Sequence, residues 1–421
     1  MVSSDEVSLY LQYVDNASFN RNGHNLAVCF NLDRRLQAID DQALIRGLNQ
    51  LEIISTSIIR DKVIGSVTVF VLKAMLSLAK SEIEKAAQEY IDGLKKLSEA
   101  IMQQQRNENE KNSGFWMVPT LKLMVKQAYL LVKRADHSSS NSNQTDSIWR
   151  LYHSVLMYAF NVSCTGESEE CWDQSAKLGA LCIINHLLRV LIKLGTLKSC
   201  FTILTRLQIC YWPEHEDPPR QGQNIPGHLL CKSEMIAYHY YTGRLKLLQD
   251  DFTGARSDLM EALARCPKTA IKNKQRILIT LVPLNISFGR IPTIHILEKY
   301  NLMIFSGFVK ALKLGSISSF NKAMNDYQLF FIKTGTFLML EKMKLAVYRS
   351  FLKRHINFFQ TQENIETGKS PILNLLSVQK ALAIQGEAME MEELECLLSN
   401  LITLDLVKGY ISHSSKKIGF G

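Results

Sequence analysis

The sequence predicts an all-α protein: a right-handed helical-repeat solenoid capped by a C-terminal winged helix with a small β-hairpin. Two observations predict this fold. Apolar residues recur at helical spacing along most of the 421 residues, with short breaks between the segments. Near the C-terminus, two amphipathic segments precede a strand-like run at 407–413, a Ser-Ser turn and a second run at 416–420. Helices followed by a short hairpin are the order of elements in a winged helix.

The composition supports a folded, mostly helical chain. Hydrophobic residues make up 46% and charged residues 21%, and only 9 Pro and 21 Gly are present, so a sizeable core is possible. The net charge of +9 permits an anionic partner, nucleic acid or an acidic protein. A scattered surface excess of Lys and Arg explains the same number, so both interpretations stay open.

Residues 1–114 form the first predicted part, an N-terminal helical region. A short amphipathic segment at 5–14 precedes helical patterns at 40–60 and 63–105, and a polar surface linker is expected at 103–114. The N-terminus has neither a basic nor an apolar signal-peptide region. The longest apolar stretch, near 277–288, is too short to cross a bilayer, so no membrane insertion is expected.

Residues 115–335 form the second predicted part, a series of helices. A helix at about 116–134 is followed by a Ser-rich loop at 137–143, and later breaks fall at 165–166, 195–196, 243, 267 and 289. A Pro-rich loop at 212–226 interrupts the series. Small residues mark one helix pair at the spacings of a tetratricopeptide repeat: Gly243, Ala255, Leu259, Ala262 and Pro267. One pair cannot bury its apolar face alone, so we expect a tetratricopeptide-like solenoid.

Residues 336–421 form the third predicted part, the winged helix. A long helix beginning near Phe337 is expected to cover the open end of the solenoid with one apolar face. That face carries Phe337, Leu340, Tyr348, Phe351 and Phe359. A third helix of this part, at about 390–404, begins with several glutamates, which suit a helix N-terminus.

No constellation in the sequence predicts catalysis, a cofactor or a metal. Phosphate-binding glycine loops, zinc-protease motifs and serine-nucleophile motifs are missing. The acidic run at 214–217 is expected to be a solvated loop, and His186 a core histidine with satisfied hydrogen bonds. The nine cysteines lack metal-ligand spacing and are expected to be mostly buried, reduced thiols. We therefore expect a protein that is not an enzyme.

Two groups of basic residues are candidates for nucleic-acid binding. Lys342, Arg349 and Lys353 share one predicted helix face, and the predicted wing carries Lys408, His413, Lys416 and Lys417. If both groups lie on one side, they form a strip that can follow phosphates. An ordinary solvated face is the alternative for the helix residues. The glutamates of the third helix would repel phosphates, so base reading in a major groove is not expected.

Long segments of the sequence resemble a known family. They are residues 273–283 (NKQRILITLVP), 330–335 (FFIKTG) leading into 340–344 (LEKMK), and 400–402 (NLI) through 407–413 (VKGYISH), and 241–244 (YTGR) also fits. The chain resembles the PCI domain family, in which helical repeats end in a winged helix, and within it the PCI domain-containing protein 2 class. The resemblance covers about 230–418. The loops at 137–143 and 212–226 depart from the family.

The resemblance implies a non-enzymatic scaffold subunit of a nuclear transcription-coupled mRNA-export complex. Such a subunit pairs with a large scaffold subunit that has its own PCI-like domain, and with a small acidic disordered subunit. Paired winged helices then bind the RNA or DNA backbone with low sequence specificity. The implied location is the nucleus, at the nuclear pore, and a cytoplasmic pool is compatible with it. The alternative is a protein–protein scaffold subunit of a signalosome- or proteasome-lid-like assembly, with no nucleic-acid role.

Overall fold

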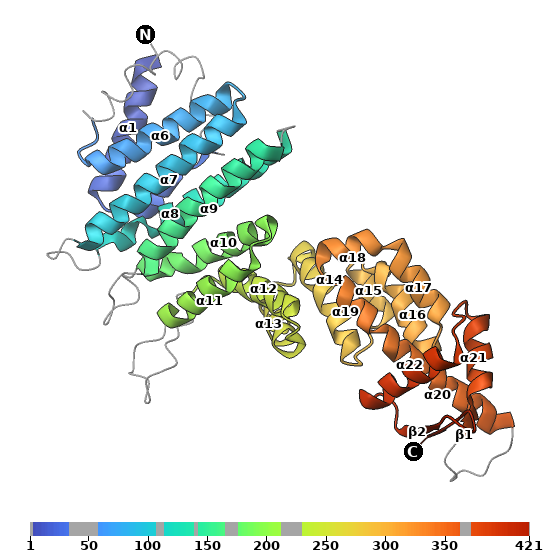
Figure 1. Cartoon of the computed structure of the whole chain (residues 1–421). Helices are drawn as coiled ribbons and strands as arrows, with labels where there is room; N and C mark the ends of the chain where they lie inside the picture. The colour runs from blue at the N-terminus through green and yellow to red at the C-terminus, as the bar shows by residue number, and fades with distance from the viewer. Residues whose placement is uncertain are drawn as a thin grey trace, which may run out of the picture. The chain divides into compact units, whose positions relative to one another are not determined.

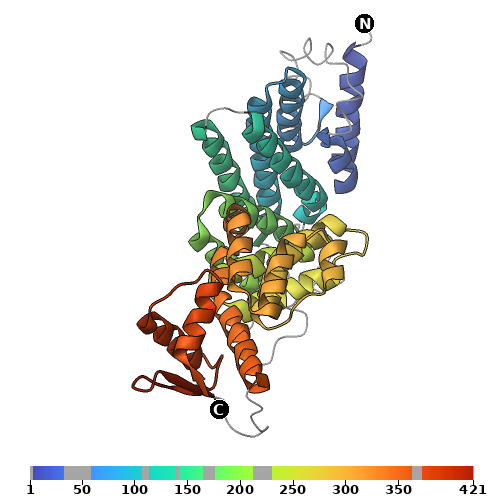
Figure 2. The same cartoon turned by 90° about the vertical axis from the view of Figure 1, so that its right-hand side faces the viewer.

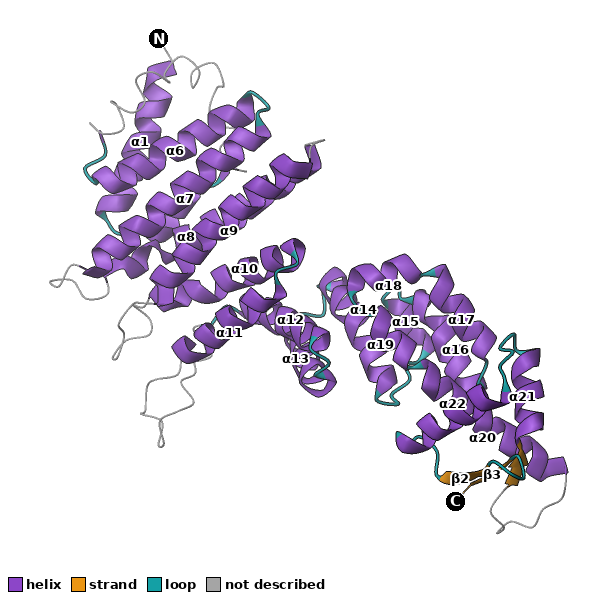
Figure 3. Cartoon of the chain, in the orientation of Figure 1, coloured by secondary structure: helices purple, strands orange, loops and turns teal. Residues whose placement is uncertain are grey.

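The computed structural model describes residues 3–32, 58–106, 113–138, 142–164, 176–211, 230–362 and 372–420. Over these ranges the chain is almost entirely helical, with three short strands near the C-terminus (Figure 3). It divides into two compact units, Met1–Tyr241 and Thr242–Gly421 (Figure 1). The boundary falls inside helix α12 (Lys232–Leu248), a position that the sequence pattern did not indicate. The predicted all-α fold class is confirmed.

The first unit consists of helices that pack mostly on their neighbours in sequence. They are α1 (Ser3–Phe19), α2 (Gly23–Cys29), α6 (Lys62–Ala79), α7 (Ile83–Arg106), α8 (Val118–Ser138), α9 (Ser142–Cys164), α10 (Ala180–Leu194) and α11 (Leu197–Tyr211), with the 3₁₀ turns η2 (Ser113–Met117) and η4 (Ala176–Gly179). α6 packs along α7, and α7 also packs on α8 and α9. The helical patterns at 63–105 and 116–134 are confirmed, whereas residues 40–57 lie outside the described ranges.

Two predicted loops are partly helical. α7 continues through Arg106, because Gln and Arg are good helix formers. The Ser-rich loop is shorter than expected, since α8 ends at Ser138 and α9 begins at Ser142. Ser and Asn suit the first turn of a helix, where their side chains can accept from free backbone N–H groups. The predicted loop at 212–226, with its acidic run, lies outside the described residues.

α6 is the apolar core helix of the first unit. Of the described helices it alone is both long enough and apolar enough to cross a membrane, and 61% of its residues are buried inside the unit. Such burial is typical of a core helix. The sequence pattern pointed to the stretch near 277–288 and not to α6, because Lys73 interrupts the apolar residues of α6.

A buried hydrogen-bond network holds α2, α7 and α8 together. The hydroxyl of Tyr90 donates to Oε1 of Gln127 over 2.7 Å, and the amide of Gln127 donates to Oδ1 of Asn31 over 2.6 Å. The backbone N–H of Leu32 donates to the same Oε1 over 3.3 Å. Buried polar groups cost free energy unless they are paired, so this network fixes where α2 lies on α8.

The helix pair predicted from small residues is α12 and α13 (Phe252–Arg265). Ala255, Leu259 and Ala262 are fully buried on α13. The sequence pattern predicted a break between helices at Gly243, but Gly243 lies inside α12. A Cβ at Gly243 would lie 2.8 Å from Cγ of Leu259, so only glycine allows the two helices this approach.

The second unit continues the helical series and ends in the small sheet. Its elements after α13 are α14 (Ile271–Ser287), α15 (Ile294–Lys299), η5 (Met303–Phe305), α16 (Ser306–Leu314), α17 (Ile317–Asp326), α18 (Gln328–Thr334), α19 (Phe337–Lys342), α20 (Lys344–Gln362), β1 (Ile372–Asn374), α21 (Leu375–Ile384), α22 (Met391–Thr403), β2 (Gly409–Ser412) and β3 (Lys417–Phe420). Phe305, Phe308, Phe320 and Phe331 form an aromatic core between these helices.

The long helix predicted from Phe337 onwards is two helices. α19 ends at Lys342, and α20 begins at Lys344 after a single turn residue, Met343. Leu340, Tyr348 and Phe351 are buried as expected, and α20 packs on α16 and α17. The predicted covering role of this segment therefore agrees with its packing, but a continuous helix was wrong.

The C-terminal elements have the order of a winged helix: α20, β1, α21, α22, β2, β3. The sheet has three antiparallel strands in the order β1-β3-β2, where a two-strand hairpin was expected (Figure 2). The extra strand, β1, is only three residues long and is formed by pairing with β3. The helix predicted at 390–404 is confirmed as α22.

Eight of the nine cysteines lie in the described ranges, and all eight are free thiols. Four of the eight are buried, so the expectation of mostly buried thiols holds for half of them: Cys29, Cys182, Cys200 and Cys266. Cys396 is exposed, contrary to the expectation for its apolar context. It lies between Leu394 and Leu398, which face the core, and therefore points to the outer side of α22.

Glu387, in the segment before α22, connects that part of the winged helix to α20 and to α17 of the solenoid. Its Oε1 accepts from Lys344 over 2.7 Å and from the amide of Asn321 over 2.5 Å. Its Oε2 accepts from the hydroxyl of Tyr348 over 3.2 Å. Burial alone would raise the pKa of Glu387, but the bonds from Lys344, Asn321 and Tyr348 outweigh it and hold the pKa below 4.5.

Glu387→Gln should lower the free energy of unfolding at pH 7 by about 1–2 kcal/mol, because the charge-assisted bonds become neutral ones. The folded-state pKa is lowered, so this contribution is present above the ordinary pKa and is lost as the pH falls through the folded-state value. Urea unfolding should show the stabilities of wild type and variant converging as the pH is lowered through the acid range. Glu392→Gln, on an exposed residue of α22, is the control. A constant gap across this pH range would refute the role of the charge.

Candidate nucleic-acid interface

The sheet of the winged helix has one buried and one exposed face. In the register, Ile418 of β3 lies opposite Leu373 of β1 and Ile411 of β2. Ile418 and Leu373 are almost fully buried. Side chains alternate along a strand, so Lys417, the residue before Ile418, points to the opposite, solvent-exposed face.

Tyr410 lies in the middle of this exposed face. It pairs with Gly419, and a Cβ at Gly419 would lie 2.7 Å from Cε1 of the tyrosine ring. The ring therefore lies against the glycine, and 66% of Tyr410 is exposed. Our reading of the sequence missed Tyr410. The alternation around Ile411, which faces the core, was the signal that could have found it.

Three lysines lie along the same hairpin as Tyr410. Lys417 lies at one end of the sheet face, and Lys408 directly precedes β2 at the other end, four residues or roughly 13 Å along the strand from Ser412. Lys416 occupies the turn with φ 50°, and its carbonyl accepts from the backbone N–H of Leu375 over 2.9 Å. All three side chains are exposed, and none has an acidic partner in the part of the chain that the structure describes.

His413, the fourth predicted wing residue, is held differently. Its Nδ1 lies 2.7 Å from Oε2 of Glu395 on α22, although 81% of the histidine side chain is exposed. Glu395 is therefore turned toward the wing. The carboxylate of Glu395 lies against the imidazole, so His413 adds less positive charge to the face than the lysines do.

The helix residues do not join the wing as one continuous strip. Lys342 lies on α19, apart from the other two, and pairs with Asp250 over 3.2 Å. Arg349 and Lys353 are exposed on α20. On that helix Tyr348, Phe351 and His355 face inward, and His355 reaches Ser377 of α21 over 3.4 Å. Arg349 and Lys353 therefore point away from α21.

The N-terminus of α22 is acidic and closed by its own side chains. Glu390 and Glu393 form a capping box, in which each side chain accepts from the backbone of the other residue. Glu392 and Glu393 are exposed beside it. The capping box already occupies two of the N–H groups at this end of the helix, and its glutamates carry negative charge that repels phosphates.

Metal chemistry finds no support in the described ranges. They contain no group of three or more His, Cys, Asp or Glu side chains arranged to hold a metal ion. The exposed sheet face carries lysine charges that can bind phosphates, the ring of Tyr410 that can stack on a base, and the apolar side chain of Ile372.

Comparison with known proteins gives a consistent set of similarities. Residues 228–304 match a family model described as PSMD3-like, N-terminal TPR repeats. The chain is 31% identical to the PCI domain-containing protein 2 homolog of Dictyostelium discoideum over 293 residues, 70% of this chain and 64% of that protein. It is 27% identical over 306 residues to PCI domain-containing protein 2 of Xenopus laevis, 72% of this chain and 71% of the relative.

A third relative comes from another named group. The chain is 28% identical over 248 residues to the protein CSN12 homolog of Gibberella zeae, 57% of this chain and 53% of that protein. PCI-domain proteins are generally non-catalytic scaffolds in multi-subunit complexes. The helical series, the winged helix and these similarities together place the chain in the PCI domain family, beside the proteins named PCI domain-containing protein 2.

Proposed function

We propose that this chain is a non-catalytic scaffold subunit of a nuclear complex that couples transcription to mRNA export. In this role the wing contributes to binding the RNA or DNA backbone. The observation that supports it is the exposed hairpin, which carries Lys408, Lys416 and Lys417 on either side of Tyr410. Lysines without an acidic partner can neutralise phosphates, and their release of counterions drives binding.

The geometry favours backbone contact over base reading. Lysine is a point charge that distinguishes bases poorly, whereas paired donors and acceptors are needed to read a base edge. The acidic start of α22 disfavours the usual insertion of the third helix in a duplex groove. Tyr410 suits stacking on an unpaired base, which is tolerant of sequence. The proposed ligand is therefore single-stranded nucleic acid, bound with low sequence specificity.

The proposed partners are a large scaffold subunit with its own PCI-like domain and a small acidic disordered subunit. A second winged helix beside this one would extend the basic face. The proposed location is the nucleus, at the nuclear pore. Arg349 and Lys353 would contact nucleic acid only as a second patch, since they lie on the far side of α20 from α21.

A protein–protein scaffold without nucleic-acid binding is the second candidate function. The same part of the unit exposes apolar side chains: 59% of Ile372 and 44% of Leu376 are exposed, besides Tyr410. Exposed apolar groups that lie together favour a protein partner. The similarity to a protein CSN12 homolog favours this candidate as well.

Affinity purification of the tagged full-length chain from cells tests the proposal. We expect one large PCI-like subunit and one small acidic subunit to co-purify in equal amounts and to remain after nuclease treatment. RNA should be recovered with the untreated complex. Recovery of signalosome subunits alone, without RNA, would overturn the export proposal and favour the second candidate.

A further inference from the structure

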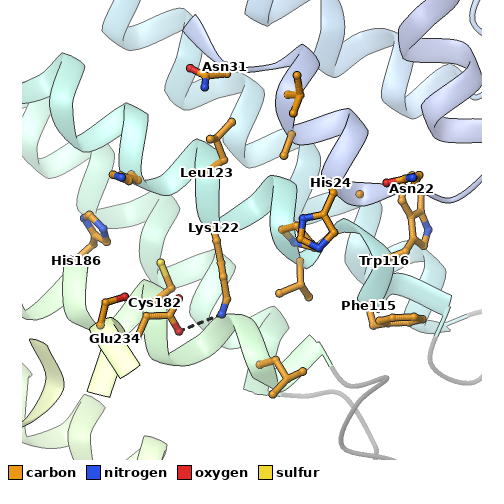
Figure 4. A pocket seen from close by; sticks show the side chains of 18 of the residues that line it. Asn22, His24, Asn31, Phe115, Trp116, Lys122, Leu123, Cys182, His186 and Glu234 are labelled. Atoms are coloured by element: carbon orange, nitrogen blue, oxygen red, sulfur yellow. Dashed lines mark hydrogen bonds and ion pairs between the residues drawn. The ribbon is translucent and has the colours of Figure 1, made fainter. Parts of the chain in front are cut away.

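The first unit contains a cavity of about 1080 Å³ that the proposed function does not use. It lies between α2, η2, α8, α10 and the start of α12, and Figure 4 shows the side chains that line it. Ligand pockets for small molecules have about this volume or somewhat less. The residues of its wall come from positions as far apart as 20 and 237.

One part of the wall is cationic. Lys122 is paired with Glu234 over 3.0 Å, and both side chains are largely buried. Arg189 donates to the hydroxyl of Tyr241 over 2.6 Å, and its guanidinium lies 4.6 Å from the centre of the Tyr129 ring.

Neither Arg189 nor Lys126 has a carboxylate partner in the described part of the chain. Arg189 is half-buried, and a buried charge without a counter-ion is costly. The cationic wall therefore lacks an anion that would balance its charge.

Two polar atoms of the same wall are buried without hydrogen-bond partners. Asn185 is 6% exposed; its amide donates to the backbone carbonyl of Glu234 over 2.8 Å, but its Oδ1 has no partner. Nδ1 of His186 also has no partner, so the expectation of a satisfied core histidine was wrong. Burial, then the charges of Arg189 and Lys126, lower the pKa of His186 to about 3, so the ring is neutral.

A neutral imidazole and an amide can each form a hydrogen bond with a bound molecule. Orphaned buried groups are uncommon in folded proteins, and a ligand is one way to satisfy them. Asn185 and His186 are neighbours on α10, next to the cationic residue Arg189 on the following turn. The polar atoms without hydrogen-bond partners and the cation without a counter-ion therefore lie on the same part of the cavity wall.

The other end of the cavity is aromatic. Figure 4 shows His24, Phe115 and Trp116 together, on the opposite side of Lys122 from His186. Phe115 is 37% exposed and His24 is exposed, whereas Trp116 is buried and donates to Gln104 over 3.2 Å. Exposed rings at a cavity wall can stack on a planar group.

We propose that this cavity binds a small molecule with a planar ring at one end and phosphate groups at the other, the chemistry of a nucleoside polyphosphate. The phosphates lie against Lys126 and Arg189, within reach of His186. The planar ring lies against His24 and Phe115. Oδ1 of Asn185 accepts from a hydroxyl or amine of the ligand. An acidic peptide could pair with the cationic residues, but its carboxylates would not stack on the aromatic side chains at the other end of the cavity.

Isothermal titration calorimetry on the full-length chain tests the proposal, with ADP, adenosine and inorganic pyrophosphate as probes. ADP should bind more tightly than either fragment, because each fragment meets only one end. Lys126→Gln should weaken ADP binding about tenfold, the value of one charge-assisted contact. Phe115→Ala should weaken ADP binding and leave pyrophosphate binding unchanged.

The controls separate this site from the wing. Lys133→Gln, two turns further along α8 and outside the cavity wall, should bind ADP as wild type does. Glutamate substitutions of Lys416 and Lys417 should leave ADP binding unchanged. The proposal is overturned if ADP gives no binding at millimolar concentration, or if the Lys126 and Lys133 variants behave alike. Binding of a poly-glutamate peptide that depends on Lys126, with none of ADP, would also overturn it.

Discussion

Replacing both Lys416 and Lys417 with glutamate should lower the affinity of the purified complex for single-stranded RNA by about a hundredfold at 0.1 M salt. Each substitution removes a contact that neutralises a phosphate and adds a repulsive charge in its place. Both side chains are exposed at the turn and on the open face of the sheet, so the fold should tolerate the change.

The dependence on salt makes this result specific. Each lost phosphate contact should reduce the slope of log affinity against log salt by about 0.7 on a single strand, so two should reduce it by roughly 1.4. Fluorescence anisotropy with a labelled RNA, titrated at several salt concentrations, measures both quantities. Glutamate substitutions of Lys310 and Lys313 on α16 change the net charge equally and serve as the control. Equal losses in the two double variants would mean that overall charge, and not the wing, governs binding.

Gly315→Ala should destabilise the second unit by about 3 kcal/mol or more. Gly315 ends α16 with φ 62°, a conformation that costs an L residue free energy. A Cβ there would lie 2.5 Å from the backbone N of Phe351 on α20. Backbone cannot move aside as a flexible side chain can, so α20 must shift away from α16.

Gly289→Ala separates the two contributions. Gly289 has φ 75°, but no atom lies within 4 Å of its added Cβ, so this variant meets only the conformational cost of about 1 kcal/mol. The midpoint of urea unfolding of the full-length chain measures both variants. Equal shifts would contradict the close approach of α16 to α20 and, with it, the account of how the winged helix is attached.

Local patterns in the sequence predicted the parts of the fold that depend on local chemistry. The small residues of α12 and α13 lead directly to a helix pair, and the two strand-like runs on either side of the Ser-Ser turn lead to a hairpin. The break between α19 and α20 at Met343 was not predicted, because no Gly or Pro lies there to mark the end of a helix. β1 is three residues long and exists because β3 pairs with it. A strand of that length carries too little periodicity to be read alone.

The candidate functional sites depend even more than the fold on contacts between residues that are far apart in the sequence. The wing lysines could be named from the sequence because they adjoin a predicted turn. Lys342 could not be separated from Arg349, since its partner Asp250 is 92 residues away in the chain. The cavity of the first unit is assembled from five elements, and only the fold determines that Nδ1 of His186 has no partner and that Arg189 has no carboxylate beside it. A helix pattern marks His186 as a core residue and says nothing of its missing partner.

Ultraviolet crosslinking of the purified complex to RNA, followed by mass spectrometry of the crosslinked peptides, tests the nucleic-acid role of the wing most directly. We expect crosslinks at Tyr410 and in the peptides that carry Lys408, Lys416 and Lys417, with none at the start of α22. Crosslinks confined to other parts of the chain, or to partner subunits alone, would contradict the assignment of the wing as the nucleic-acid interface.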